Sequence, residues 1–220
     1  MDLLAGVPAI DLGGGAPDLG LPLTLGLVAL GWLAGSFPSA IVVGRLVGID
    51  PRTEGDGNPG SANVWKLAGP AAGTAVFALD LAKVVLPGIA GWLAGGFWGA
   101  WCAAIGAVLG AMWPLVPGVP GGRGVNAGAG AAIVLHPPAA AIAIGLFAAT
   151  WLVARRRVVA VAVGFAAYPI GAAVLSVRSL DDAWLLAGIG LLYLVLVARY
   201  AATARRTRPA PDPDGSPPGT

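Results

Sequence analysis

The chain has 220 residues, of which 57% are hydrophobic and only 11% are charged, and its formal net charge is +2. Soluble domains carry about 25% charged residues, so this composition excludes an ordinary soluble globular protein and places the chain in a lipid bilayer. The single cysteine, Cys102, lies in an apolar run and excludes both a disulfide framework and a cysteine metal cluster.

The first apolar run follows an acidic segment, residues 1–20, which lacks a basic leader and is assigned to the extracytoplasmic side. A spanning helix needs about 20 mostly apolar residues. The first candidate is 21–47, which contains Pro38 and should be kinked there. The second and third candidate spans are residues 70–93 and 97–116.

The next apolar stretch, residues 124–152, is interrupted by His136, Pro137 and Pro138. Two full spans do not fit into this length, and a pair of prolines does not suit the interior of one helix. We therefore expect two short helices or a re-entrant pair, with His136 at a helix terminus. The last two candidate spans are residues 158–177 and 183–199.

Basic residues indicate how the chain crosses the membrane. If the N-terminus is outside, eleven of the 13 lysines and arginines fall on the cytoplasmic side, the exceptions being Lys83 within a span and Arg178 outside. The same orientation requires residues 124–152 to enter and leave on one side. The predicted fold class is an all-α integral membrane protein with about seven transmembrane or partial helices and a cytoplasmic C-terminus. We expect one polytopic domain over 21–204 and a disordered cytoplasmic tail over 205–220.

A polar, glycine-rich loop follows the first span. Arg45 and Arg52 flank a stretch in which glycines alternate with hydrogen-bonding residues, namely Gly55, Asp56, Gly57, Asn58, Gly60, Ser61 and Asn63. Glycines let the backbone turn sharply, successive N–H groups in such a turn form an anion site, and an arginine fork matches two phosphate oxygens. The loop therefore predicts a phosphate site, with a plain solvated connector as the alternative.

A second glycine-rich loop, residues 118–126, contains one arginine. Gly121, Gly122 and Gly124 surround Arg123, an arrangement that fits an anion site at the start of a helix. A simple turn between two helices is the alternative. Both loops fall on the predicted cytoplasmic side, and two phosphate sites that face one another at a membrane surface indicate two phosphorylated substrates.

Three further polar side chains lie within the apolar runs. Asp80 and Lys83 are three residues apart and share one helix face. They either neutralise each other or line the polar site, since charges in a span usually face the bundle interior. Ser36 either bonds back to the preceding helical turn or points into the site. No group of metal-ligating residues stands out, so we expect neither a metal nor a cofactor.

Five motifs occur in a fixed order: G-S-x-P at 35–38, D-x-R-x-x-G-x-G-N-x-G-S-x-N at 50–63, L-D-x-x-K at 79–83, G-x-x-W-P at 110–114 and G-G-R-G-V at 121–125. Together they resemble the bacterial membrane glycerol-3-phosphate acyltransferases that use acyl phosphate as the acyl donor. The resemblance implies a seven-helix protein of the bacterial inner membrane with its site at the cytoplasmic face. There an acyl group moves from phosphate to the 1-hydroxyl of glycerol 3-phosphate, giving lysophosphatidic acid for phospholipid synthesis.

By position, the resemblance implies that Ser36, Arg45 and Arg123 are catalytic and that Asp80 and Lys83 support the site. Substrate-binding positions are Arg52, Gly57, Asn58, Gly60, Ser61, Asn63, Gly121, Gly122 and Gly124. No protein nucleophile is required, because an acyl phosphate is already activated and its phosphate can accept the proton of the attacking hydroxyl. We expect acyl phosphate, glycerol 3-phosphate and membrane lipid as partners, no nucleic acid, and contact with other lipid-synthesis enzymes.

The chain departs from the family pattern at three informative positions. Asp56 stands where a serine is usual, and Ala111 and Tyr200 stand where histidines are usual. These departures leave two alternatives: a catalytically weak or inactive paralogue that binds a phosphorylated ligand or a partner, and a small-solute transporter that uses the broken helix as a gate. Against the transporter, the arginines and glycine loops gather on one face, whereas transporter sites lie near the midplane. The acyltransferase is favoured because the first loop keeps most of its polar groups.

Overall fold

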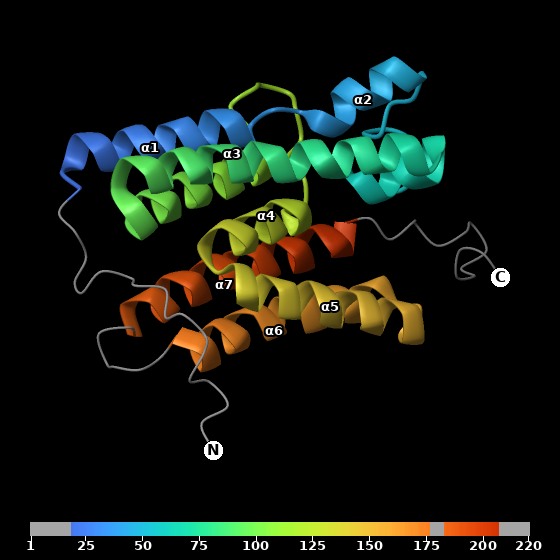
Figure 1. The fold of residues 1–220 in the computed structure, drawn as a ribbon. Coiled ribbons are helices and arrows are strands. Elements are labelled where there is room, and N and C mark those ends of the chain that lie inside the picture. The colour runs from blue at the N-terminus through green and yellow to red at the C-terminus, as the bar shows by residue number, and fades with distance from the viewer. Residues whose placement is uncertain (1–18, 177–182, 207–220) are drawn as a thin grey trace.

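The computed structural model describes residues 19–176 and 183–206, and within these ranges every regular element is a helix. Figure 1 shows the helices lying side by side, with the chain running back and forth along one direction. Residues 1–18, 177–182 and 207–220, which include most of the predicted N-terminal segment and tail, lie outside the described residues. The helices are α1 (Leu21–Gly35), α2 (Ser39–Val47), α3 (Ser61–Met112), α4 (Val125–Leu135), α5 (Pro137–Ala154), α6 (Arg157–Ser176) and α7 (Ala183–Arg206).

The first predicted span is two helices. α1 ends at Gly35 and α2 begins at Ser39, so the residues around Pro38 interrupt the helix rather than only kinking it. Proline has no N–H to donate, and its ring clashes with the carbonyl of the preceding turn. In Figure 1 α2 extends beyond α1 from this break. The break therefore opens backbone polar groups within an otherwise apolar run.

α3 consists of three helical segments rather than one rod. Gly69 and the pair Gly95–Gly96 have non-helical backbone angles and divide it into residues 61–68, 70–94 and 97–112. Gly96 has a φ of 58°, a left-handed value that glycine adopts without strain. The chain reverses there, and the last segment returns alongside the middle one (Figure 1). Both predicted spans are therefore confirmed as separate helices, although the later one ends at Met112 rather than Val116.

α1 lies directly against the last segment of α3. A methyl group added at Gly31 or Gly35 of α1, or at Gly106 or Gly110 of α3, would overlap backbone atoms of the other helix. Both pairs are spaced as G-x-x-x-G, the pattern that lets membrane helices approach closely. We call these four positions the glycine seam. It fixes the break at the end of α1 relative to the end of α3, where the second polar loop begins.

The apolar stretch after the second loop breaks at His136, as predicted. α4 has 11 residues and is too short to cross a bilayer, whereas α5 has 18 and is long enough. His136 is buried between them, and its Nδ1 accepts a hydrogen bond of 3.2 Å from the Ala139 N–H, so it caps α5. In Figure 1 α5 runs back toward the end from which α4 enters. The two helices therefore form a hairpin.

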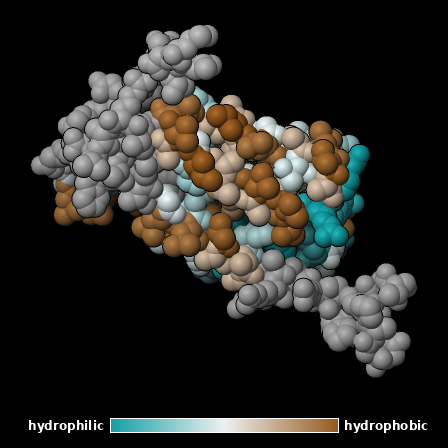
Figure 2. Space-filling model, turned by 90° about the horizontal axis from the view of Figure 1, so that it is seen from below, coloured by the Kyte–Doolittle hydropathy of each residue, from teal (hydrophilic) through white to brown (hydrophobic). Residues whose placement is uncertain are grey.

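The surface is that of a membrane-embedded protein. Four of the described helical stretches are long and apolar enough to cross a bilayer: Leu21–Val47, Ser61–Met112, Pro137–Ala154 and Val158–Leu175. Large apolar side chains such as Leu46, Leu93 and Val153 are 81–86% exposed. Figure 2 shows a broad hydrophobic surface with hydrophilic residues gathered at one end. Soluble monomers rarely expose apolar patches of this size, so the integral-membrane fold class is confirmed.

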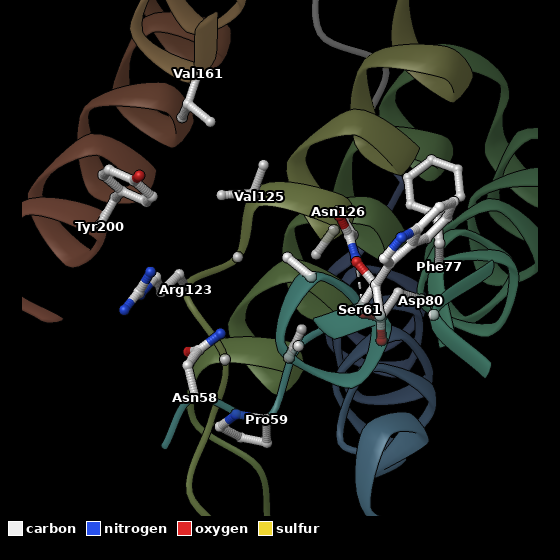
Figure 3. Close-up of a pocket in the computed structure, with 18 of the residues that line it drawn as sticks. Asn58, Pro59, Ser61, Phe77, Asp80, Arg123, Val125, Asn126, Val161 and Tyr200 are labelled. Atoms are coloured by element: carbon white, nitrogen blue, oxygen red, sulfur yellow. Dashed lines mark hydrogen bonds between the residues drawn. The ribbon is translucent and has the colours of Figure 1, made fainter. Parts of the chain in front are cut away.

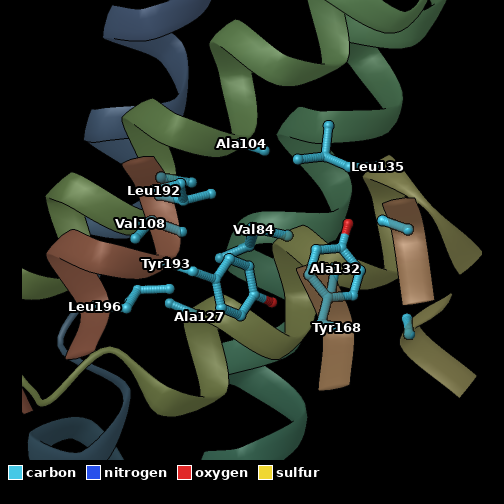
Figure 4. Close-up of a cluster of buried hydrophobic side chains, with 14 of the residues drawn as sticks. Val84, Ala104, Val108, Ala127, Ala132, Leu135, Tyr168, Leu192, Tyr193 and Leu196 are labelled. Atoms are coloured by element: carbon cyan, nitrogen blue, oxygen red, sulfur yellow. The ribbon is translucent and has the colours of Figure 1, made fainter. Parts of the chain in front are cut away.

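A pair of stacked tyrosines joins α6 and α7 to the rest of the bundle. The rings of Tyr168 and Tyr193 lie 4.8 Å apart, and Tyr193 Oη donates a hydrogen bond of 3.0 Å to Gly128 O of α4. Figure 4 shows this pair in the buried cluster where α7 meets α3 and α4. α7 continues to Arg206, so residues 205 and 206, which were assigned to the tail, belong to this helix. This packing brings the end of α7 to the second polar loop.

Candidate active site

A cavity of about 530 Å³ lies where the two polar loops meet the helical bundle. Its polar lining includes Asp56, Asn58, Ser61, Asp80, Lys83, Arg123 and Asn126. The remaining lining is largely apolar and aromatic and comes from several helices, with Trp65 and Phe77 of α3, Phe147 and Trp151 of α5, Val161 of α6 and Tyr200 of α7. Such a lining suits a ligand that combines a polar head with an apolar chain.

Two helix N-termini converge in the polar part of the cavity. Ser61 begins α3 and Asn126 is the second residue of α4, and Asn126 Nδ2 donates a hydrogen bond of 2.9 Å to Ser61 Oγ. Both helices start after a glycine, Gly60 or Gly124, without a side-chain cap. The N–H groups of a first helical turn have no carbonyl partner four residues back and carry the positive end of the helix dipole. Two such termini side by side suit an anion, as the glycine-rich loops predict.

Asp80 is the centre of a hydrogen-bonded network around these termini. Its Oδ1 accepts from Ser39 Oγ of α2 at 2.8 Å and lies 2.8 Å from Lys83 Nζ, while its Oδ2 accepts from Asn126 Nδ2 at 3.0 Å (Figure 3). The Asp80 and Lys83 side chains are only 13% and 12% exposed. The pair is therefore neutralised within the bundle, and it also lines the cavity; its role in supporting the site stays a prediction.

Arg123 reaches the cavity from the loop between α3 and α4. The next residue, Gly124, has a φ of 80°, and a side chain there would meet core residues of α3 and α7. Glycine is therefore needed where the loop turns into α4. The guanidinium carbon of Arg123 lies 5.8 Å from the centre of the Tyr200 ring. Figure 3 shows Arg123 between Tyr200 and Asn58, so its positive charge adds to that of the helix termini.

Asn63 holds the first loop in shape and is fully buried. Its Nδ2 donates to Pro51 O at 3.1 Å and to Glu54 O at 2.9 Å, and its Oδ1 accepts from the Asp56 N–H at 3.0 Å. Both N–H groups of the amide are thus used inside the loop, and Asn63 does not line the cavity. We interpret it as a residue that positions the loop residues that do.

A sequence model of the glycerol-3-phosphate acyltransferase family matches residues 25–209. The chain belongs to this family. Curated relatives include the glycerol-3-phosphate acyltransferase of Rubrobacter xylanophilus, 43% identical over 129 residues, and that of Klebsiella pneumoniae, 41% identical over 138 residues. These alignments cover 58% of this chain and 63% and 61% of the two relatives, which is less than two thirds of the relatives' own length.

Solved structures of one glycerol 3-phosphate acyltransferase share the fold. PlsY, an integral membrane protein, in its glycerol 3-phosphate form aligns with a TM-score of 0.74 and 25% sequence identity, over 83% of this chain and 90% of that chain. Its lysophosphatidic acid form aligns with a TM-score of 0.73 over the same shares. The likeness in fold thus covers more of the chain than the curated sequence alignments do.

Most positions that the acyltransferase motifs single out line the large cavity: Asn58, Gly60, Ser61, Asp80, Lys83, Gly122, Arg123 and Gly124. Ser36 and Gly121 instead line an adjoining cavity of about 30 Å³, which shares Asp80, Lys83 and Gly122 with the large one. Ser36 Oγ donates to Trp32 O at 2.7 Å and accepts from the Leu115 N–H at 3.1 Å. The structure thus shows the bond back to the preceding turn, and contact of Ser36 with a substrate stays a prediction.

The two arginines that flank the first loop do not line the large cavity, and neither does Gly57. Arg45 is exposed on α2. Arg52 forms an exposed ion pair of 2.6 Å with Asp50, and the hydrogen bonds from its side chain and then its backbone lower the pKa of Asp50 to about 2. Neither Arg45 nor Arg52 is therefore brought to the cavity that Arg123 lines. Substrate contact by Arg45 or Arg52 stays a prediction.

Sequence reasoning missed several residues that the structure brings to the site. Ser39 and Asn126 complete the Asp80 network. Asn126 did carry a signal, because it is a lone amide at the start of an apolar helix. Tyr200 was noted only as a departure from the family pattern, and the aromatic lining had no local signal, since only helix packing brings these side chains to the cavity. Within the described ranges, no group of three or more His, Cys, Asp or Glu side chains is placed to hold a metal ion.

Proposed function

We propose that this protein is a membrane acyltransferase that transfers the acyl group of an acyl phosphate to the 1-hydroxyl of glycerol 3-phosphate, giving lysophosphatidic acid and inorganic phosphate. The observation that carries this function is the cavity in which Arg123 and two helix N-termini adjoin an apolar lining. Membership of the family, and the glycerol 3-phosphate and lysophosphatidic acid forms of PlsY, support these substrates.

The reaction needs no protein nucleophile. The 1-hydroxyl oxygen attacks the carbonyl carbon of the acyl phosphate, a carbon–oxygen bond forms, and the bond from that carbon to the phosphate oxygen breaks. Phosphate is the leaving group, and it takes the proton of the attacking hydroxyl. Arg123 and the N–H groups that begin α3 and α4 hold phosphate and stabilise the negative charge that develops. The protein thus acts by positioning and electrostatics.

The apolar lining accounts for the acyl chain. Trp65, Phe77 and Trp151 line the cavity and are 50%, 42% and 46% exposed. On a surface embedded in a bilayer, exposed aromatic side chains face lipid, so a hydrocarbon chain can reach the cavity from the membrane while its phosphate stays in the polar part. A small-solute transporter does not need an apolar lining that opens to lipid, so this lining favours the acyltransferase.

The direct test is an assay of the purified protein with acyl phosphate and radiolabelled glycerol 3-phosphate, in which we expect labelled lysophosphatidic acid. Arg123→Ala should lower kcat by about 10²- to 10³-fold, the usual loss when one group that stabilises developing charge is removed. Arg156→Ala is the matched control, because Arg156 is exposed between α5 and α6. Absence of product from the wild-type protein, together with retained phosphate binding, would replace this proposal with the inactive-paralogue alternative.

We further propose that the N-terminus lies outside and that the polar loops face the cytoplasm at a bacterial inner membrane. Figure 1 supports this arrangement, because the first loop, the α5–α6 connection and the end of α7 lie at one end of the bundle. The test uses Arg156→Cys in a Cys102→Ala background, since Cys102 is buried and the chain has one cysteine. If an impermeant maleimide labelled this cysteine in intact cells, the residue would lie outside, and the proposed orientation would be wrong. Contact with other lipid-synthesis enzymes stays a prediction.

A further inference from the structure

Tyr200 is a cavity residue that comes from the last described helix. It shares one face of α7 with Tyr193 and Leu196, which are seven and four residues earlier. Tyr193 bonds to Gly128 O at 3.0 Å, and Leu196 is fully buried against the start of α4. These contacts fix the position of α7 and place the Tyr200 ring 5.8 Å from the guanidinium carbon of Arg123.

We propose that Tyr200 is a positioning residue that holds the Arg123 guanidinium in place for the phosphate group of a substrate. The identity of that substrate rests on the proposed function. The positioning itself rests on the observed contact between the ring and the guanidinium. An arginine side chain loses much of its rotamer freedom when it is fixed on a ligand. A ring that already holds the guanidinium makes this loss smaller at the moment of binding. The observed separation is within the roughly 6 Å over which an aromatic face attracts a cation.

The contact leaves arginine's hydrogen-bonding capacity intact. The five N–H donors of a guanidinium lie in its plane, and an aromatic ring attracts the cation through the ring's π face without accepting those N–H groups as conventional hydrogen bonds. Figure 3 shows Asn58 on the side of Arg123 that is away from Tyr200. A phosphate can therefore be held between Arg123 and the polar loop while the ring supports the other side.

A second arginine–aromatic pair lies next to the first and provides an internal comparison. Arg199, the neighbour of Tyr200, lies 5.1 Å from the centre of the Trp113 ring and donates from Nη2 to Met112 O at 3.1 Å. Neither Arg199 nor Trp113 lines the cavity. This pair attaches α7 to the end of α3 without lining the ligand site. A substitution in this pair therefore tests the docking of α7 without changing the contact that positions Arg123.

The test compares Tyr200→Leu, Tyr200→Phe and Trp113→Leu in the full-length protein. Inorganic phosphate is the binding probe, measured by thermal stabilisation, and KM is measured for each substrate. Tyr200→Leu should weaken phosphate binding about 2- to 30-fold, the range of a cation–π contact between exposed and desolvated sites. It should raise the same KM that Arg123→Lys raises and should lower kcat far less than Arg123→Ala does, because the charge of Arg123 remains. Tyr200→Phe keeps the ring and should match the wild type.

Unchanged phosphate binding in Tyr200→Leu would overturn the proposal. An equal loss in Tyr200→Phe would assign the effect to the hydroxyl, and an equal loss in Trp113→Leu would assign it to the docking of α7; either result also overturns it. In an Arg123→Gln background, Tyr200→Leu should have no further effect, because no cation remains to be positioned. A protein that shows the expected phosphate binding but forms no lysophosphatidic acid would uphold the positioning role and refute the proposed function.

Discussion

The side-chain amide of Asn126 donates a hydrogen bond of 3.0 Å to the carboxylate of Asp80. The same nitrogen also donates to Ser61 Oγ at 2.9 Å. One residue therefore connects the N-terminus of α4, the N-terminus of α3 and the middle segment of α3. Because the acceptor is a largely buried charge, this contact contributes to both the position and the charge balance of the cavity.

Asn126→Ala should lower kcat/KM by about 10-fold or more, since a hydrogen bond to a charged group contributes about 1.5–3 kcal/mol. The change also leaves the two helix N-termini unconnected. Asn126→Asp keeps the size but places a second negative charge beside Asp80, so its loss should be larger. Steady-state kinetics of the three proteins measure this order. Wild-type kcat/KM in Asn126→Ala would show that the network does not position the site.

Asp80→Leu alone should lower the free energy of unfolding by about 3–5 kcal/mol, because Lys83 is left as an uncompensated charge in the bundle. Adding Lys83→Met should restore much of that stability. It should not restore activity, because Ser39 and Asn126 still lack their acceptor. Thermal unfolding and the acyl-transfer assay on both variants separate the two effects. Full activity in the double variant would mean that the pair only neutralises itself.

Asn63→Ala should loosen the first polar loop. The substitution removes three hydrogen bonds, and each buried polar group left without a partner costs about 1–3 kcal/mol. Limited proteolysis should then cut within residues 50–60 faster than in the wild type, and KM should rise. Asn63→Asp keeps the acceptor but places a buried carboxylate against the carbonyl oxygens of Pro51 and Glu54, so it should loosen the loop at least as much as Asn63→Ala. An equally resistant loop in Asn63→Ala would contradict the role assigned to this side chain.

The Arg52–Asp50 pair gives a prediction about pH. The pKa of Asp50 is lowered from 3.8 to about 2, so its contribution to stability is present above the ordinary pKa and is lost as the pH falls through about 2. Arg52→Gln should raise the pKa of Asp50 back toward 3.8, as measured by NMR of labelled aspartate carboxyls. At neutral pH, KM should be unchanged, because neither side chain lines the cavity. A raised KM would bring Arg52 into the site, as the motif predicts.

Prolines and glycines made the helix boundaries predictable from sequence. Pro38 and the Pro137–Pro138 pair lie at the two breaks because proline donates no backbone hydrogen bond to the preceding turn, although Pro87 and Pro169 lie inside helices that continue past them. The Gly95–Gly96 reversal falls between two predicted spans. The glycine loops likewise pointed to the region of the cavity. These features are local in the chain, so a sequence pattern can reveal them.

Contacts between helices were not predictable in the same way. Asn126 meets Asp80, and Tyr200 meets Arg123, only because of how α4 and α7 pack and turn about their axes. Uniformly apolar helices give no periodic signal for the face that turns inward. Arg45 is the opposite case. Its place in a motif predicted a site residue, but it lies on the exposed side of α2, which the motif could not indicate.

The glycine seam determines where this chain can change over evolutionary time. At Gly31, Gly35, Gly106 and Gly110 even alanine would force two backbones apart. An exposed leucine such as Leu93 instead contacts only lipid. A hydropathy scale does not reveal this difference, because it is a difference in the space available to a side chain. Mutational tolerance should nevertheless alternate along the same helices, with neutral drift on the lipid side and strict selection along a line of residues that have no side chain at all.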